Sequence, residues 1–166
     1  NQEYITIECL QPIEMGNSIG LLSEAGIPCV ADPGYSVVRL AHLLNITVTP
    51  LSGDSSILIA LMSSGLQGQQ FTFHGYLPIK PELLKRKLKQ IEKHALQDYT
   101  QIFIETPYRN ERLMNFIVQN CNKDLFLCVA SNLLTNEQYI KTQTISTWSK
   151  LLPTLNNKPS VFLIGK

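Results

Sequence analysis

The sequence lacks the features that mark several common protein classes. Its 166 residues contain no apolar run close to the roughly 18 to 20 residues that a membrane-spanning helix needs, and no basic-then-apolar leader stands at the front. No G-x-x-x-x-G-K-[ST] phosphate loop, G-x-G-x-x-G dinucleotide motif, G-x-S-x-G elbow or H-E-x-x-H motif occurs. We therefore expect a cytoplasmic protein with no membrane segment and none of these familiar nucleotide-binding or hydrolytic sites.

The cysteines show no metal-binding or disulfide pattern. The four cysteines form no C-x-x-C pair and have no histidine at ligand spacing; they are Cys9, Cys29, Cys121 and Cys128. This spacing favours buried, reduced thiols over a zinc site or a disulfide framework. We expect no structural metal.

Charge is low and unevenly distributed. Hydrophobic residues make up 44% of the chain and charged residues 16%, enough apolar material for one domain or two small lobes. Residues 1–74 hold one basic and six acidic residues, whereas residues 75–166 hold thirteen basic and seven acidic residues, a balance of −5 against +6. A basic half can bind RNA, although a solvated surface has the same composition.

Short apolar or alternating segments take turns with helix-like segments along the chain, which predicts an α/β fold. The expected strands cover residues 4–10, 19–22, 46–50, 70–78, 100–104, 125–130, 137–145 and 160–164, and the expected helices cover residues 35–45, 57–62, 82–97, 111–119 and 148–152. Pro78 and Pro81 interrupt the chain where the charge balance changes sign. We place a boundary there, between a first lobe of residues 1–77 and a second lobe of residues 78–166.

The segment from Gly20 to Gly34 is the strongest candidate for a ligand-binding loop. It follows the expected strand 19–22, contains several Gly, Pro and acidic residues, and leads into a helix. Ligands of open α/β sheets bind at the carboxyl ends of strands, although Gly and Pro also serve plain turns. Asp54 and Ser55 precede the next helix, where small polar side chains can cap the helix or hold a polar ligand.

Four segments then resemble one known family. Ser23-Glu24-Ala25-Gly26-Ile27-Pro28 with Ala31-Asp32-Pro33-Gly34 resembles the S-[DE]-A-G-x-P-x-x-[SA]-D-P-G loop of the tetrapyrrole methylase superfamily, in its ribosomal small-subunit RNA ribose methyltransferase branch. Gly53-Asp54-Ser55-Ser56 stands where that branch has G-P-S-[AS]. The segments 73–78 and 104–109 resemble its F-x-G-[FY]-L-P and [YF]-E-[ST]-P-[HY]-R motifs, in the same order.

The resemblance implies a two-lobed α/β methyltransferase with a mostly parallel sheet in the first lobe and a mixed sheet in the second. It implies S-adenosyl-L-methionine as cofactor, ribosomal RNA as substrate, and a homodimer. Carried over motif by motif, the cofactor-binding residues would be Ala25, Gly26, Ile27, Pro28, Val30, Ser55, Ser56, Thr106, Leu133 and Ser160. The basic residues that could meet RNA phosphates are Lys85, Arg86 and Arg109. No catalytic residue is identified.

The chain also departs from the family pattern. The family's opening strand and Pro-containing loop are not found in the 166 residues, so we expect the first lobe to be incomplete at its N-terminal side. Glu24 replaces the commoner Asp, and Asp54 replaces Pro in the second motif. Two alternatives therefore stay open: a methyltransferase for a tetrapyrrole or other small molecule, and a non-catalytic module that only binds the cofactor.

Overall fold

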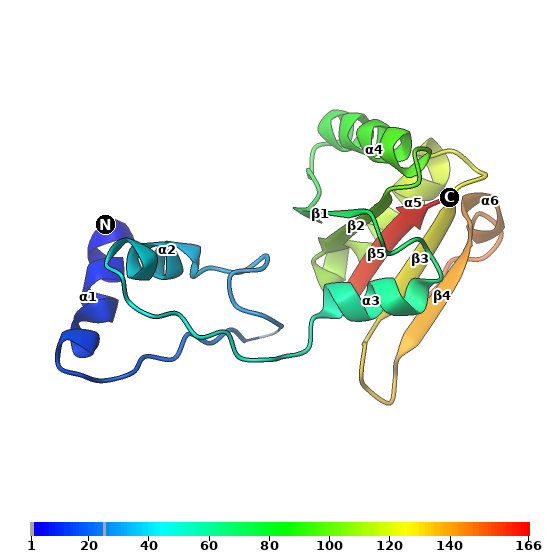
Figure 1. The fold of residues 1–166 in the computed structure, drawn as a ribbon. Helices are drawn as coiled ribbons and strands as arrows, with labels where there is room; N and C mark the ends of the chain where they lie inside the picture. Colours follow the sequence, from blue (N-terminus) through cyan, green and yellow to red (C-terminus); the bar gives the residue numbers. More distant parts are fainter. Residues whose placement is uncertain (1, 25) are drawn as a thin grey trace. The chain divides into compact units, whose positions relative to one another are not determined.

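The computed structural model describes residues 2–24 and 26–166, and for residues 2–7 it describes the backbone alone. The chain divides into two compact units, residues 1–55 and residues 56–166 (Figure 1). In the described part of the chain, no helix is both long enough and apolar enough to cross a membrane.

The first unit is built on two helices, α1 (Gln2–Glu14) and α2 (Tyr35–Leu43), which pack against each other. Leu10 of α1 and Ala41 of α2 are buried. The segments before and after α2 follow irregular paths. Gly34 at the start of α2 has a φ of 125°, a conformation that favours glycine.

Three strand predictions in this unit are wrong. Residues 4–10 lie within α1, and residues 19–22 and 46–50 form no strand. Leu22, expected inside a sheet, is 89% exposed. A strand is stable only when a neighbour takes up its backbone hydrogen bonds, and the described part of residues 1–55 forms no sheet that could supply one. The apolar runs therefore give no βαβ unit here.

The second unit is a five-stranded mixed sheet in the order β1-β2-β5-β3-β4. β1 and β2 are parallel, and the remaining neighbours are antiparallel. The strands are β1 (Phe71–Tyr76), β2 (Thr100–Glu105), β3 (Phe126–Ser131), β4 (Tyr139–Thr144) and β5 (Ser160–Gly165). The helical segments are α3 (Ser56–Ser64), α4 (Pro81–Ala95), η1 (Pro107–Arg109), α5 (Asn110–Asn120) and α6 (Ile145–Trp148).

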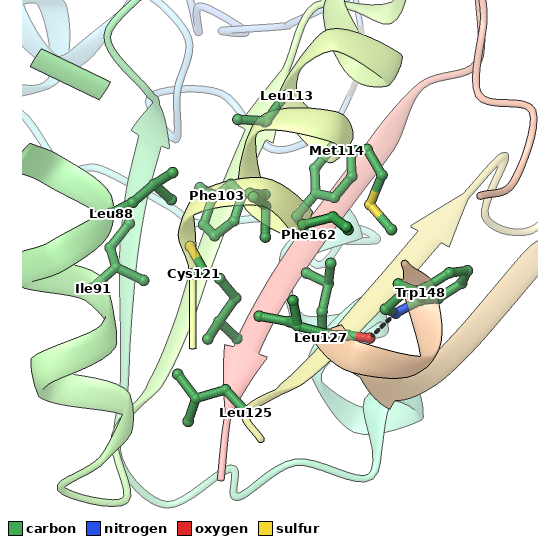
Figure 2. Packing of buried hydrophobic residues seen from close by; sticks show 14 of the residues in the cluster. Leu88, Ile91, Phe103, Leu113, Met114, Cys121, Leu125, Leu127, Trp148 and Phe162 are labelled. Carbon is green, nitrogen blue, oxygen red and sulfur yellow. Dashed lines mark hydrogen bonds between the residues drawn. The ribbon is translucent and has the colours of Figure 1, made fainter. Parts of the chain in front are cut away.

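The two faces of this sheet carry separate hydrophobic clusters, because side chains alternate along a strand. On one face, Phe103 and Phe162 stack with ring centroids 5.8 Å apart among residues of α4, α5 and α6 (Figure 2). On the other face, α3 inserts Ile57, Ala60 and Leu61 against the sheet. Strand β5 is buried along its whole length between these layers.

The α/β fold class and the mixed sheet are confirmed. The predicted strands at 70–78, 100–104, 125–130, 137–145 and 160–164 correspond to β1, β2, β3, β4 and β5. The expected helix at 148–152 is wrong in position, because α6 ends at Trp148. The predicted lobe boundary after residue 77 falls inside the second unit and stays a prediction.

Candidate functional site at one end of the sheet

The predicted cofactor loop of the first unit, residues 20–34, has no regular helix or strand where it is described. Its backbone turns sharply: the amide of Val30 donates to the carbonyl of Ile27 over 3.3 Å, and Gly26 has a φ of 77°. Ala25 lies outside the described residues. The loop therefore holds four predicted contacts within a short surface segment, namely Gly26, Ile27, Pro28 and Val30.

The two predicted serine contacts occupy the junction between the units. Ser55 ends the first unit and Ser56 begins α3 in the second. Ser56 is therefore the first residue of a helix that packs on the sheet of the second unit. Its side chain is exposed, and that of Ser55 is half-buried.

The remaining three predicted contacts meet at one end of the sheet. Glu105, the last residue of β2, is paired with Ser160, the first residue of β5. Ser160 is also paired with Ser131, the last residue of β3. Thr106 follows β2 directly and Leu133 follows β3 by two residues, so Thr106, Leu133 and Ser160 lie at the same end of the sheet. The sequence motifs predicted these residues separately, and the antiparallel register brings them together.

A nearly buried ion pair holds this end of β2. Atom Nη2 of Arg109 lies 2.6 Å from Oε1 of Glu105, and Arg109 Nε donates to the same oxygen over 3.0 Å. The amide of Thr106 donates to that oxygen as well, over 2.7 Å. Such a two-pronged pair combines charge attraction with fixed geometry. The guanidinium predicted to meet RNA is therefore paired with a carboxylate of its own chain, and its contact with RNA stays a prediction.

A buried asparagine ties the start of α5 to the segment before β5. The Asn110 amide nitrogen donates to the carbonyl oxygen of Lys158 over 2.6 Å and to Ser160 Oγ over 3.2 Å. Asn110 and Ser131 have no exposed surface. Within the described residues, the amide oxygen of Asn110 and the hydroxyl of Ser131 have no hydrogen-bond partner. The polar capacity at this end of the sheet is thus only partly used by the protein.

The predicted RNA-contacting residues Lys85 and Arg86 are exposed on α4. Together with Lys89 they line an open hollow of about 470 Å³ that also includes Glu82 and Gln90. Lys89 pairs with the buried Glu92 over 2.7 Å, and this hydrogen bond raises the pKa of Lys89. The opposite side of α4 packs into the core through the residues predicted for it, Leu84, Leu88, Ile91 and Ala95.

Three residues of the site were missed in the sequence: Glu105, Asn110 and Ser131. Glu105 and Arg109 stand four positions apart in the motif of residues 104–109, and that spacing offered a signal for an ion pair. Asn110 acts on residues 158 and 160. No local sequence pattern predicts such a contact, because it depends on how α5 packs beside the start of β5.

Comparisons with known proteins agree with the motifs. No known protein-family model matches the chain. The "Ribosomal RNA small subunit methyltransferase I" of Buchnera aphidicola subsp. Schizaphis graminum is 31% identical over 144 residues, which cover 85% of this chain and 50% of the relative. The protein of the same name from Vibrio cholerae is 42% identical over 94 residues, which cover 57% of this chain and 32% of the relative. The chain spans about half the length of the curated relatives it matches, or less.

Solved structures share its fold. The methyltransferase CobJ superimposes with a TM-score of 0.67 at 16% identity, over 97% of this chain and 70% of that chain. The chain shares the fold of this methyltransferase and resembles the ribosomal RNA methyltransferases in sequence over part of their length. A second structure with this fold, uroporphyrin-III C-methyl transferase from Thermus thermophilus, was solved with S-adenosyl homocysteine and has a TM-score of 0.56 at 12% identity, over 99% of this chain and 73% of that one.

Proposed function

We propose that this chain takes part in S-adenosyl-L-methionine-dependent methylation of a ribose 2'-hydroxyl in ribosomal RNA. The observation that carries the proposal is the ordered set of four motifs, together with relatives named as small-subunit ribosomal RNA methyltransferases. The sheet end of the second unit supports it, because three residues carried over from the motifs gather there.

The second unit suits the adenosine part of the cofactor. Leu133 offers an apolar surface, Ser160 offers a hydroxyl, and the charges of Glu105 and Arg109 offset each other. A neutral nucleoside prefers such a mixture of apolar surface and a few fixed polar groups. By motif resemblance alone, we also assign the loop residues Gly26, Ile27, Pro28 and Val30 and the serines Ser55 and Ser56 to cofactor binding.

The chemistry requires little from the protein beyond placement. Bound S-adenosylmethionine supplies an electrophilic methyl group on a positively charged sulfur. The residues of this chain hold the cofactor, orient it toward the acceptor oxygen and keep water out, and such positioning accounts for large rate enhancements. A base within hydrogen-bond reach would take the proton of the ribose hydroxyl.

RNA is favoured over a small acceptor by the basic surface of α4. Lys85 and Arg86 project from it, and Lys89 stays charged beside Glu92. Phosphate contacts of this kind supply much of the affinity for nucleic acids. A tetrapyrrole or other small-molecule acceptor is the second candidate, favoured by the names of the structural neighbours. A non-catalytic cofactor-binding module is the third. The homodimer and the cytoplasmic location stay predictions.

Cofactor binding is tested by titrating the chain with S-adenosylhomocysteine in a calorimeter. Gly26→Ala should weaken binding, because a methyl group there hinders close approach of a ligand to the backbone. Gly16→Ala is the matched control: both glycines have positive φ, and neither added methyl group would meet an atom within 4 Å. Equal affinity in the two variants would contradict the loop assignment.

The acceptor is identified by incubation with tritiated S-adenosylmethionine and either small ribosomal subunits or a tetrapyrrole. Label in RNA should survive alkali as a resistant dinucleotide, because a 2'-O-methyl group blocks cleavage of the adjoining phosphodiester. Label in the tetrapyrrole fraction would favour the second candidate. Binding of the cofactor without transfer to any acceptor would favour the third.

A further inference from the structure

The end of β2 is organised around a single carboxylate oxygen. Oε1 of Glu105 accepts the backbone amide of Thr106 and both Nε and Nη2 of Arg109. The Glu105 side chain is 7% exposed and that of Arg109 is 19% exposed. Shielding from water strengthens such charge-assisted contacts, so this junction is rigid compared with a surface ion pair.

The contacts of Glu105 and Arg109 hold Thr106 in place. Its amide is held by Glu105, its carbonyl oxygen accepts the amide of Arg109 over 2.8 Å, and its hydroxyl oxygen accepts Nε of Arg109 over 2.9 Å. The same hydroxyl lies 3.3 Å from Oε1 of Glu105 and donates to it. The polar groups of Thr106 are therefore engaged within the protein, and its methyl group is the part best placed to contact a ligand.

A second arm of the network reaches β5. Asn110 follows Arg109 directly, and its amide nitrogen holds the carbonyl of Lys158 and the hydroxyl of Ser160. Thr106, which follows β2, and Ser160, which begins β5, are thus fixed by two neighbouring residues, Arg109 at the end of η1 and Asn110 at the start of α5.

We infer that Glu105 is a positioning residue: through Arg109 it fixes Thr106 and the start of α5, and so holds the second-unit part of the cofactor site ready for its ligand. This inference rests on the proposed function, because it takes Thr106 and Ser160 as cofactor contacts. A group that orients ligand-binding residues contributes as much to ligand affinity as many direct contacts do, when the geometry of the site must be held closely.

The chain contains a matched control for this role. Glu92 is also a buried glutamate of the second unit, is also paired with one basic side chain, and also accepts a backbone amide, that of Asn122. β2 and β3 run in the same direction, because β5 lies between them and is antiparallel to both. Glu105 ends β2, whereas Glu92 holds Asn122, which precedes β3. The two glutamates therefore lie at opposite ends of the sheet. If Glu105 has a purely structural role, substitutions of Glu105 and of Glu92 should have similar effects on ligand affinity.

The experiment compares Glu105→Gln with Glu92→Gln in the whole chain, measuring thermal stability and the dissociation constant for S-adenosylhomocysteine. Both variants should lose stability. Glu105→Gln should in addition bind about tenfold more weakly, at the lower end of what loss of an orienting partner costs, while Glu92→Gln keeps the wild-type constant. Arg109→Lys keeps the charge but not the two-pronged geometry. Its dissociation constant should therefore lie between those of wild type and Arg109→Met.

The outcomes separate the two proposals. If the wild-type chain binds S-adenosylhomocysteine but Glu105→Gln and Glu92→Gln change the constant equally, the positioning role is wrong and the cofactor proposal stands. If the wild-type chain does not bind, both proposals fail. If Glu105→Gln does not fold, the dissociation constants of Arg109→Lys and Arg109→Met for S-adenosylhomocysteine are compared instead. Equal constants in these two variants overturn the inference.

Discussion

The indole nitrogen of Trp148 donates a hydrogen bond to the carbonyl oxygen of Leu127, 2.9 Å away (Figure 2). Trp148 is 2% exposed and Leu127 is fully buried, so this contact joins α6 to β3 inside the larger core. It fixes a short helix that has little stability of its own.

Trp148→Phe should therefore lower the free energy of unfolding by about 2 kcal/mol, since a smaller ring leaves space and the Leu127 carbonyl is left without its donor. Urea unfolding followed by circular dichroism measures the change, because the variant removes the chain's single tryptophan. Leu151→Ala is the control: Leu151 is 80% exposed, and its truncation should change stability by less than about 0.5 kcal/mol.

The basic surface of α4 gives a prediction for RNA binding. Lys85→Glu with Arg86→Glu should weaken binding to ribosomal RNA and reduce the salt dependence of the binding constant. The slope of log K against log salt should fall by about 0.7 to 0.9 for each phosphate that the variant no longer neutralises. A filter-binding series at several salt concentrations measures this slope.

The control for that experiment reverses two other exposed lysines, Lys150 and Lys166, and so changes the net charge equally. If both double variants weaken binding to the same extent, total charge rather than the α4 surface determines affinity.

The cysteines should differ in reactivity. Burial raises the pKa of Cys121 to about 12 and also raises that of Cys128, whereas Cys9 is exposed and Cys29 is half-buried. The prediction of buried thiols is thus confirmed for two cysteines and wrong for Cys9. Iodoacetamide at about pH 8 should label Cys9 first and leave Cys121 and Cys128 unmodified until the protein unfolds, because the thiolate is the reactive form.

Peptide mass spectrometry locates the label. Modification of Cys121 as fast as Cys9 in the folded protein would contradict this assignment of the core.

His74 should make stability depend on pH. Burial lowers its pKa below the ordinary value of 6.5; nearby Lys87 and His94 act in the same direction, and the hydrogen bond with Gln101 opposes them. The unfolded chain therefore binds the proton more readily than the folded chain, so stability is lost as the pH falls below about 6.5. Melting temperatures at about pH 7.5 and about pH 5 measure the loss.

In His74→Gln this acid-induced loss should be smaller than in wild type. His42→Gln serves as control because His42 is exposed on α2. An equal loss in wild type and His74→Gln would show that other groups cause the acid sensitivity.

The sequence alone determined most of the second unit. The apolar stripe of α4 and the buried runs of β2, β3 and β5 were readable because each segment repeats with the period of its own structure. The four motifs also pointed to the ribosomal RNA methyltransferases that the chain resembles in sequence, because they depend on residue type and order. In the first unit the same reasoning failed at residues 4–10, 19–22 and 46–50, since a short apolar run does not reveal whether a neighbouring strand is present to pair with it.

Only the tertiary structure decided the internal geometry of the candidate site. The motifs named Thr106 and Ser160 as separate contacts, but the register of β2, β5 and β3 places them at one sheet end with Glu105 and Ser131. The sequence suggested that Arg109 meets RNA, which stays a prediction, and gave no sign that folding would pair its guanidinium with Glu105 at this sheet end. The physical reason is that pairing between distant strands and the burial of a charge depend on the whole packed unit, and no local pattern of residues encodes either.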